Sequence, residues 1–361
     1  MSTENDIAGL IAEQLDRLLA LQVTAEKRKA VEGGRFDDAL WSECEALGLT
    51  SALVLEGSGG AGLTWSHINP SLLVLGKHAA PVPLGETLIA NRLLSNAGLD
   101  MVDGAVATGF DLLSLSADGS VQGTAKGVSW APVCPHVLLL AEREGQLHFC
   151  LMRTEDLTLS ALKTFSREPS ADVTCNGVQP VAVAALGEEF SQSTVLAHFA
   201  VLHTAQIAGA LAYMLPLCVE YANDRVQFGR PIAKFQAIQH ALAQLASEAA
   251  ASQAAAFFAC GKADAGAVEY GAMVGMSRAG RAATLGAEIA HQVFGAIGFT
   301  DEHSLHYFTR RLWQWRSAAK SEQWWSEKLG ERIIAAGGDA LWPHIVAADM
   351  PTIQAKEGPS P

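Results

Sequence analysis

The chain has 361 residues, of which 49% are hydrophobic and 17% charged, and its formal net charge is −13 at pH 7. That length is sufficient for two or three domains with a large core, and the apolar excess suggests subunit interfaces. The negative charge argues against a nucleic-acid partner or an anionic membrane. The six cysteines show no Cys-x-x-Cys and no zinc spacing, which predicts buried thiols in a reducing cytoplasm rather than a disulfide or metal framework.

The N-terminal segment, residues 1–100, is predicted to form a helical domain. It contains the pattern Gly-x-Gly-x-x-Gly at residues 57–62 (GSGGAG), which in some proteins binds a dinucleotide. No βαβ unit surrounds the pattern here. We therefore expect a tight loop between helices.

Residues 101–190 differ in amino-acid pattern from the helical segments on either side of them. Runs of β-favouring residues alternate with Asp-Gly, Glu-Gly and Asn-Gly pairs, which are typical of hairpin turns. This pattern predicts a small middle β domain.

Long Ala- and Leu-rich helices are predicted over residues 191–345. The stretch Val195–Val219 is apolar enough to suggest a membrane span, but His198 and Pro216 interrupt it. A helix that is apolar on nearly all faces is more simply the centre of a helical bundle in a soluble protein. Residues 346–361 are rich in Pro, Gly and Lys and are expected to form a disordered tail.

Two further groups of residues carry no predicted chemistry. The eleven histidines include no His-x-x-x-His pair with a nearby acid, so no metal site is predicted. The tryptophans near the C-terminus could in principle stack on nucleic-acid bases, but in an acidic chain we expect them in the core or at an interface. They are Trp313, Trp315, Trp324 and Trp325.

The segment NDRVQFGRPIAKFQAIQH, residues 223–240, breaks one apolar helix and starts another. Gly229 and Pro231 are expected to stop the first helix, because Gly tolerates a left-handed conformation and Pro cannot continue the hydrogen-bond ladder. That stop does not require Arg225, Gln227 or Gln236. These polar side chains need another explanation.

A second segment, HQVFGAIGFTDEH, places Gln292 just before Gly295. An arginine can bind a pyrophosphate in a bidentate way, glutamine amides can pair with adenine or ribose, and glycine lets a cofactor approach the backbone. Alternatively, the polar residues of both segments cap helices and form interhelical hydrogen bonds. The spacing alone leaves both interpretations open.

These two segments resemble the acyl-CoA dehydrogenase family, whose motifs read RxQFGxPIxxFQ and QxxGGxGFTxEH, and weaker similarity extends over roughly residues 20–340. The resemblance implies an α+β, mainly α fold with an N-terminal helical domain, a middle β-barrel and a C-terminal four-helix bundle, assembled as dimers or tetramers. It also implies FAD at a subunit interface. In the family, the flavin ring lies against the β domain of one subunit while the neighbour's bundle holds the ADP part through the positions that match Arg225, Gln227, Phe228, Gln236, Gln292 and Gly295.

The resemblance also implies a catalytic carboxylate, which removes the α-proton of an acyl-CoA. Counting along the chain from the two motifs reaches Ala318–Lys320 for one group of members and Phe199 for another, and neither position carries an acid. Glu322 could serve only if the loop is shifted by about three residues. On the flavin side, Trp130 could contact the ring.

The sequence therefore resembles the base-lacking subunit of bacterial heteromeric acyl-CoA dehydrogenases, which often act on bulky thioesters such as those of steroid side chains. Such a subunit would complete the FAD site of a base-bearing partner, and an electron acceptor such as electron-transfer flavoprotein is expected. Two alternatives stay open. One is a self-sufficient homo-oligomeric enzyme with a displaced base, and the other is a scaffold or acyl-CoA-binding protein without a redox role.

Overall fold

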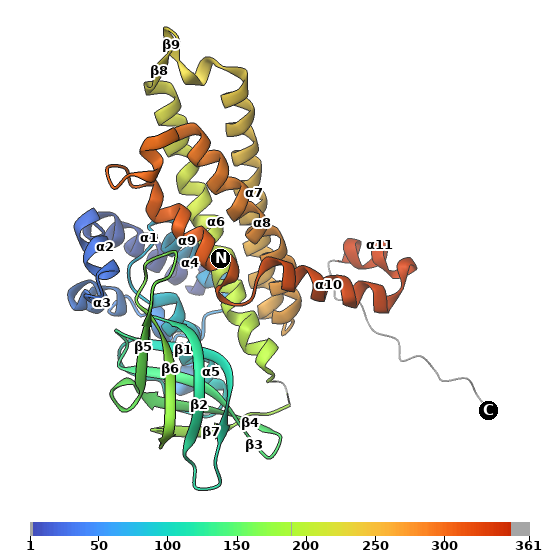
Figure 1. Cartoon of the computed structure of the whole chain (residues 1–361). Helices are drawn as coiled ribbons and strands as arrows, with labels where there is room; N and C mark the ends of the chain where they lie inside the picture. Colours follow the sequence, from blue (N-terminus) through green and yellow to red (C-terminus); the bar gives the residue numbers. More distant parts are fainter. Residues whose placement is uncertain (1–2, 189, 348–361) are drawn as a thin grey trace.

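The structure is a computed structural model that describes residues 3–188 and 190–347. Along the chain, a group of N-terminal helices is followed by one sheet and then by a bundle of long helices (Figure 1). This arrangement confirms the predicted fold class, which is mainly helical with a central sheet.

The N-terminal part consists of helices that begin at well-formed caps. For example, the Thr64 hydroxyl accepts the His67 N–H while the His67 ring accepts the Thr64 N–H. As the sequence predicts, residues 57–62 form a tight loop, in which a Cβ on Gly60 would lie 2.1 Å from the Val54 carbonyl oxygen. The elements are α1 (Thr3–Gln22), α2 (Ala25–Glu32), α3 (Asp38–Glu45), η1 (Leu49–Ser51), η2 (Glu56–Ser58), α4 (Trp65–Lys77) and α5 (Leu84–Asn96).

The middle part is a seven-stranded sheet in the order β5-β6-β2-β1-β3-β4-β7. Its strands are β1 (Val106–Leu115), β2 (Val121–Ser129), β3 (His136–Arg143), β4 (Gln146–Arg153), β5 (Thr158–Leu162), β6 (Ser170–Val178) and β7 (Ala182–Ala185), with the short helix η3 (Thr154–Asp156) before β5. The hairpins β1–β2 and β3–β4 are antiparallel, whereas β1 and β3 run parallel. In the described part of the chain β5 and β7 are edge strands that do not pair with each other, so the expected barrel is an open sheet.

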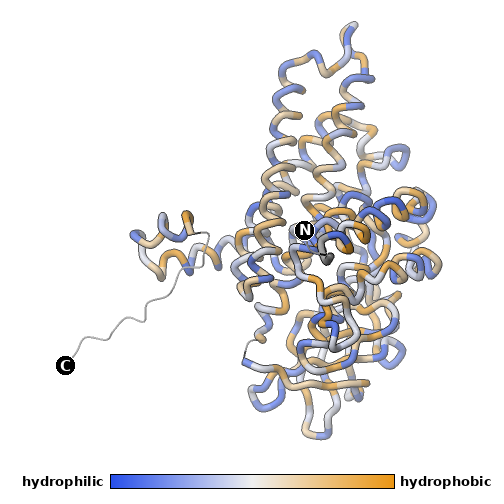
Figure 2. Tube along the Cα trace, turned by 180° about the vertical axis from the view of Figure 1, so that it is seen from behind, coloured by the Kyte–Doolittle hydropathy of each residue, from blue (hydrophilic) through white to orange (hydrophobic). Residues whose placement is uncertain are grey.

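The C-terminal part is built around α6 (Gln192–Asp224), α7 (Gln236–Asp264) and α8 (Val268–Phe294). By length and composition α6 could cross a membrane, but 94% of its most apolar window is buried inside the protein. Figure 2 shows apolar residues along the inside of the bundle and mostly polar residues in its outer turns. The remaining elements are β8 (Val226–Gln227), β9 (Arg230–Pro231), η4 (Ile232–Lys234), η5 (Gly295–Phe299), α9 (Leu305–Ala318), α10 (Glu322–Ala336) and α11 (Gly338–Ala347).

Close packing joins the N-terminal helices to the bundle. A Cβ on Gly209 of α6 would lie 1.9 Å from the Leu73 carbonyl oxygen of α4, so only glycine allows the two backbones to approach this closely. The six cysteines are all free and buried, as predicted. Of the expected tail, residues 346 and 347 belong to α11, and the other residues lie outside the described part of the chain.

Candidate functional site

The first candidate site lies where α6 ends. The helix stops at Asp224, and Arg225 follows in an extended conformation with its N–H donating to the Tyr221 carbonyl at 2.9 Å. A tight hairpin comes next, because Phe228 and Gly229 both have positive φ, 52° and 77°. Two successive positive φ values are typical of the turn that joins two short antiparallel strands. The expectation that Gly229 stops the helix is therefore wrong, since the glycine serves the hairpin turn instead.

The hairpin, the start of α7 and the end of α8 enclose an open cleft of about 390 Å³, which we call the outer cleft. Five of the six predicted cofactor-binding residues line it: Arg225, Gln227, Phe228, Gln292 and Gly295. The sixth, Gln236, is the exposed first residue of α7 and is not part of the lining. Segments that lie far apart in the sequence are thus brought together.

The walls and charge of the outer cleft are suited to a flat, anionic ligand. Tyr221 stacks on Phe294 with ring centroids 4.3 Å apart and forms an apolar floor. Within the described residues, no carboxylate lies within ion-pair distance of the Arg225 guanidinium, so its charge is available. Gly295 has φ 61° and ψ −142°, a conformation that residues with a side chain rarely adopt, and it leaves the backbone bare at the end of α8.

Phe228 stands out at the tip of the hairpin, where 92% of its side chain is exposed. A large apolar residue in a left-handed conformation and in contact with water is doubly unfavourable. Its only ring neighbour in the described chain is Phe235, at 6.1 Å. Such a side chain is typical of a contact with another molecule.

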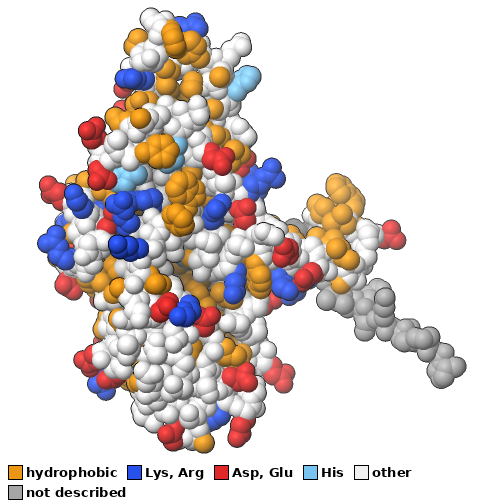
Figure 3. All heavy atoms as spheres, viewed as in Figure 1, with side chains coloured by type: hydrophobic (Ala, Val, Ile, Leu, Met, Phe, Trp, Pro, Cys, Tyr) orange, Lys and Arg blue, Asp and Glu red, His pale blue; other side chains and the backbone are white. Residues whose placement is uncertain are grey.

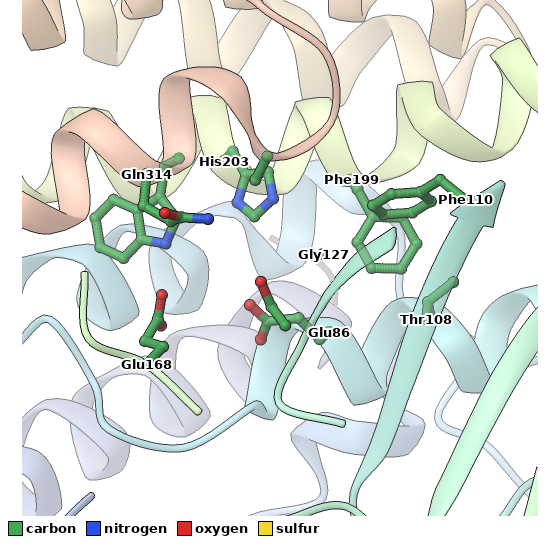
Figure 4. Close-up of a pocket in the computed structure, with 11 residues that line it drawn as sticks. Glu86, Thr108, Phe110, Gly127, Glu168, Phe199, His203 and Gln314 are labelled. Atoms are coloured by element: carbon green, nitrogen blue, oxygen red, sulfur yellow. The ribbon is translucent and has the colours of Figure 1, made fainter. Parts of the chain in front are cut away.

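The second candidate site is a small enclosed space between the sheet, α5, α6 and α9, which we call the inner cavity (Figure 4). Its volume is about 40 Å³, enough for one or two water molecules. Phe199 and Ala318 both line it. Phe199 marks one location at which the family resemblance implies a catalytic acid, and Ala318 is the first residue of the other, Ala318–Lys320. Phe199 packs edge-on against Phe110 at 4.9 Å, and these rings fill much of the space.

Two carboxyl groups line the inner cavity. Figure 4 shows Glu86 and Glu168 on one side of it and His203 and Gln314 on the other. Glu168 forms a buried ion pair with Arg311. Burial raises the pKa of the Glu86 carboxyl to about 7, although the Trp130 indole and the Arg311 charge act in the opposite direction.

The other polar groups of the inner cavity are neutral. Burial lowers the pKa of His203 to about 4, and its Nδ1 lies 2.9 Å from the Gln206 side-chain oxygen. The Thr108 hydroxyl is buried and has no hydrogen-bond partner in the described chain. The cavity thus combines the protonatable Glu86 carboxyl, the Glu168 carboxylate paired with Arg311 and several neutral groups, and its volume leaves no room for an acyl chain.

Glu322 and Trp130 line neither site, although the Trp130 indole forms a hydrogen bond with the Glu86 carboxyl of the inner cavity. Glu322 is the first residue of α10, and its Oε2 is so close to α8 that a Cβ on Gly280 would lie 2.9 Å from it. It does not line the inner cavity. Trp130 is 1% exposed and lies under the Arg311 guanidinium, 5.6 Å from it. Neither residue faces an open space where a substrate or a flavin ring could bind.

Side chains of the chain itself bridge the sheet and the bundle beside an open pocket of about 480 Å³, which Glu32, Arg167 and Glu168 help to line. Phe165 of the β5–β6 loop packs edge-on against Trp313 of α9 at 6.4 Å. Nearby, Glu32 of α2 pairs with both Arg310 and Arg167, the latter at 3.6 Å. These contacts, together with the buried Arg311 pair, join three parts of the chain across the boundary.

Comparisons with known proteins identify the relatives of this chain. Residues 187–316 match the family described as acyl-CoA dehydrogenase, C-terminal domain. The acyl-CoA dehydrogenase IpdE2 of Mycolicibacterium smegmatis is 28% identical over 283 residues, which are 76% of this chain and 82% of IpdE2. Residues 187–316 thus resemble the C-terminal domain of acyl-CoA dehydrogenases, and the similarity to IpdE2 extends over most of the chain.

Further similar proteins extend the comparison. FadE34 of Mycobacterium tuberculosis is 28% identical over 327 residues, which are 84% of this chain but only 44% of the length of FadE34. Two solved structures share the fold. The ChsE4-ChsE5 complex from Mycobacterium tuberculosis has a TM-score of 0.82 at 21% identity and covers 92% of this chain and 98% of its own. The Tcur3481-Tcur3483 steroid ACAD variant has a TM-score of 0.83 at 23% identity. The match covers 93% of this chain and 100% of the chain in that structure.

Within this acyl-CoA dehydrogenase fold, sequence reasoning missed Glu86. The sequence does contain a signal, because Glu86 is the only charged residue in the first turn of the largely apolar helix α5. In the structure ten residues of this helix are buried. A lone acid in so apolar a segment is worth attention, since an unpaired carboxyl is rarely buried without a role. What the sequence did not show is that this acid lines the same cavity as Phe199 and Ala318.

Proposed function

We propose that this chain is a non-catalytic subunit of an FAD-dependent acyl-CoA dehydrogenase. In this proposal its outer cleft completes the FAD site of a partner subunit, and that partner supplies the carboxylate that removes the α-proton of the acyl-CoA. The enzyme would be active only as the heteromer, a heterodimer or a pair of heterodimers.

The contrast between the two sites is the observation that carries the proposal. The outer cleft is open, at about 390 Å³, and its Arg225 charge is available. The inner cavity is nearly filled, at about 40 Å³, and neither of the two positions sought for the base carries an acid. A chain that kept the first site and closed the second can assist a cofactor but has no room for a substrate in its inner cavity.

The residues of the outer cleft fit the ADP part of FAD. A guanidinium matches the geometry of a pyrophosphate, because it offers parallel N–H donors. The amides of Gln227 and Gln292 can each donate and accept hydrogen bonds, which suits ribose or adenine edges. Gly295 adds no side chain and so leaves room for the ligand to approach the backbone.

When bound, FAD supplies the acceptor for the hydride that leaves the β-carbon of the acyl group. In this division of labour Arg225 neutralises the pyrophosphate and orients it, while Phe228 covers the ligand or the partner and excludes water. The carboxylate that takes the α-proton belongs to the partner.

The substrate and the other partners are also part of the proposal. The chain would act with an acyl-CoA thioester. A bulky one, such as a steroid side-chain thioester, agrees with the likeness to a solved structure that is itself a steroid ACAD. An electron acceptor such as electron-transfer flavoprotein would reoxidise the assembled enzyme. We expect this enzyme in the cytoplasm.

Flavin stoichiometry tests the proposal. The chain should be purified alone and after co-expression with a family member that carries the catalytic acid, and FAD should be quantified by absorbance. We expect no flavin in the chain alone and about one FAD per heterodimer. One FAD per chain in isolation would contradict the proposal, and no flavin in a stable heteromer would favour a scaffold without redox chemistry.

A self-sufficient enzyme is the second candidate, and Glu86 is the observation that favours it. Its carboxyl lines the inner cavity and has a pKa raised to about 7 by burial, which is a suitable basicity for proton transfer at neutral pH. Glu322 does not line that cavity. If the chain is active alone, Glu86 is therefore the acid to test first.

A further inference from the structure

The segment that joins α8 to α9 forms one wall of the outer cleft. Gly295 and Ala296 line the cleft and directly follow Phe294, whose ring belongs to its floor. We call residues 295–304 the cleft loop, which consists of η5 and the turn that follows it. A short irregular segment takes its shape from the side chains that hold it. The groups that hold the cleft loop therefore set the shape of the outer cleft.

His291, in the last turn of α8, holds the cleft loop. The residue is 9% exposed, and its ring stacks on the Phe299 ring of the loop with centroids 4.0 Å apart and planes at 15°. Its Nε2 lies 3.0 Å from the Thr309 hydroxyl of α9. Its Nδ1 faces Gly298, where a Cβ would lie 3.2 Å from it, and has no hydrogen-bond partner in the described part of the chain. One ring thus joins α8, the loop and α9.

Two further histidines hold the same loop. His306 is 8% exposed, and its Nδ1 donates to the His303 carbonyl at 2.7 Å. The His303 ring lies 4.4 Å from the Phe294 ring, and its Nδ1 accepts the Leu305 N–H at 3.1 Å. Figure 3 shows histidine side chains next to apolar and basic ones at the surface of this part of the molecule. We call the three residues the histidine cluster, and it ties the end of the loop at residue 303 back to its start.

The histidine cluster is neutral at pH 7 in the folded chain. Burial lowers the pKa of all three rings, and the charge of His306 lowers the pKa of the other two further. The groups that face His291 from the loop and from α9 are uncharged, namely Phe299, Thr309 and Trp313. Among the described residues, no carboxylate raises the pKa of His291 or His303.

His306 has polar and charged neighbours on three elements. Arg310 on the same helix lowers its pKa, and the Tyr307 ring, 4.1 Å away, is uncharged. The groups that raise its pKa are the His303 carbonyl, Asp301 of the loop, whose Oδ1 lies 3.9 Å from Nε2, and Glu32 of α2. Burial outweighs them, so the pKa of the ring is below the ordinary value of 6.5.

A proton added to His291 does not fit the present position of the ring. In an imidazolium both ring nitrogens donate, so Nδ1 becomes a buried donor that faces Gly298 without an acceptor. The proton is accommodated if the ring leaves its place between α8 and α9, and that movement releases the stacked Phe299. Because the folded position favours the neutral ring, the loop loses stability as the pH falls below the ordinary histidine pKa of 6.5.

We propose that His291 is a positioning residue for the outer cleft, and that protonation of the histidine cluster releases the cleft loop and so lowers the affinity of the cleft for the ADP part of FAD in mildly acidic solution. Release of the loop follows from contacts within this chain alone. The effect on FAD rests on the proposed function. An enzyme loaded with flavin at neutral pH would thus lose it in mild acid.

Hydrogen exchange tests release of the loop in the full chain without any partner. Exchange of the peptide that contains residues 295–304 should be followed by mass spectrometry from about pH 7.5 to about pH 5.5, with correction for the intrinsic pH dependence of exchange. We expect the protection factor of this peptide to fall by about fivefold or more, the effect of one buried donor without a partner. Peptides of α7 should keep their protection. A loop whose protection does not change with pH would overturn the proposal.

Three variants assign the change to His291. His291→Gln can still bond Thr309 but cannot be protonated, so it should lose most of the pH-dependent change. Phe299→Ala removes the stacked ring at a position that is 67% exposed, and it should lower the protection of the loop already at neutral pH. His240→Gln is the matched control, because His240 is exposed on α7 and does not line the outer cleft. A full pH-dependent change in His291→Gln, or unaltered protection in Phe299→Ala, would contradict the role of His291.

Flavin affinity tests the step from the loop to the cleft. In the assembled heteromer, the dissociation constant of FAD should rise by about fivefold or more over the same pH range, and His291→Gln should remove most of that rise. A constant affinity for FAD in a heteromer whose loop is released would overturn this step and leave the proposed function standing. A heteromer that holds no flavin at any pH would overturn the proposed function and this step together, whereas release of the loop is judged by exchange in the chain alone.

Discussion

Phe199 on α6 and Ala318 at the end of α9 line the same small cavity, although they are far apart in the sequence. Phe199 and the stretch Ala318–Lys320 are the locations at which the family resemblance implies the catalytic acid. Phe199 fills the space, whereas Ala318 is too small to reach into it. The absence of an acid at Phe199 and at Ala318 therefore concerns one site, the inner cavity.

Arg225→Ala is expected to weaken retention of FAD in the assembled heteromer, because the bidentate contact with the pyrophosphate is lost. Hydrogen bonds to charged groups contribute about 1.5–3 kcal/mol, which corresponds to roughly 10- to 150-fold in the dissociation constant. Arg225→Lys should recover only part of the FAD affinity, since lysine keeps the positive charge but lacks the planar pair of N–H donors. Arg230→Ala is the control, because Arg230 lies on the same hairpin but does not line the outer cleft. Equal flavin content in the wild-type heteromer and in all three variants would refute the role of Arg225.

Phe228→Asn is expected to weaken the heteromer without destabilising the isolated chain. Asparagine tolerates the left-handed conformation of residue 228, so the substitution removes the ring and keeps the turn. Because the ring is 92% exposed, the thermal midpoint of the isolated chain should change little or rise slightly. The dissociation constant between the subunits, measured by biolayer interferometry, should rise by about tenfold or more. A lower midpoint with unchanged association would show that the ring has a structural role instead.

The acids Glu86 and Glu322 separate the proposed function from its alternative. In the heteromer, Glu322→Gln should leave the turnover number unchanged, because Glu322 packs against α8. Glu86→Gln should also leave it within about twofold if the partner supplies the base. A fall of about 100-fold or more, within the range typical for loss of a general base, on Glu86→Gln alone would establish the self-sufficient enzyme. Acyl-CoA turnover with an artificial electron acceptor is the measurement.

Glu86 should make the stability of the chain depend on pH. Its pKa is about 7 in the folded chain, above the ordinary value of 4.5, so the folded state holds a proton that the unfolded state releases. At pH values below 4.5 Glu86 is protonated in both the folded and the unfolded state, so it does not lower the free energy of unfolding. As the pH rises from 4.5 to 7 the free energy of unfolding falls by about 3 kcal/mol in total, and above 7 the loss is complete.

Glu86→Gln removes this dependence. The difference in thermal midpoint between the wild-type chain and the variant, measured by calorimetry from pH 4.5 to 8, should move in favour of the variant up to pH 7 and then stay constant. A difference that is independent of pH would mean that Glu86 is ionised in the folded chain.

Gly209→Ala should strongly destabilise the chain. The added methyl would lie 1.9 Å from the Leu73 carbonyl oxygen, so α4 and α6 must separate, at a cost of about 1–3 kcal/mol or more. Gly261→Ala is the matched control in α7, where nothing lies within 4 Å of the new methyl. That substitution should stabilise the chain by up to about 1 kcal/mol, because alanine is the better helix former. Chemical denaturation of both variants measures the two effects, and equal midpoints would contradict the close approach of the helices.

Local patterns predicted the parts of the fold that depend on local chemistry. The Asp-Gly and Glu-Gly pairs predicted the hairpin turns at Gly119 and Gly145, both of which have positive φ. The apolar stretch of α6 predicted a central helix. The order of helices, sheet and bundle followed from these elements and is confirmed.

The candidate site was predictable in its residues but less so in its geometry. Arg225 and Gln292 were expected to act together, and both line the outer cleft. The direction of Gln236 could not be predicted, because one residue of difference in where α7 begins turns its side chain by about 100° around the helix. The hairpin at Phe228 was missed, since Gly229 is equally suited to a helix end or a turn.

The filled inner cavity could not be read from the sequence at all. It depends on where α5, α6, α9 and the sheet meet, and no local pattern links Phe110 with Phe199 or Glu86 with Trp130. Long-range packing of this kind appears only when the whole chain is folded.

The rings of the inner cavity also constrain how such a chain could change over generations. If the chain is the non-catalytic subunit proposed above, a descendant that gained catalysis would need both an acid at Phe199 or within Ala318–Lys320 and space for the acyl chain. An acid gained first would be a buried carboxyl without a partner, and Phe199 lost first would leave a void in the core, so either single step costs stability. Under the proposed function neither intermediate gains activity in return, so packing would hold the absence of the acid in place and make dependence on a partner difficult to reverse.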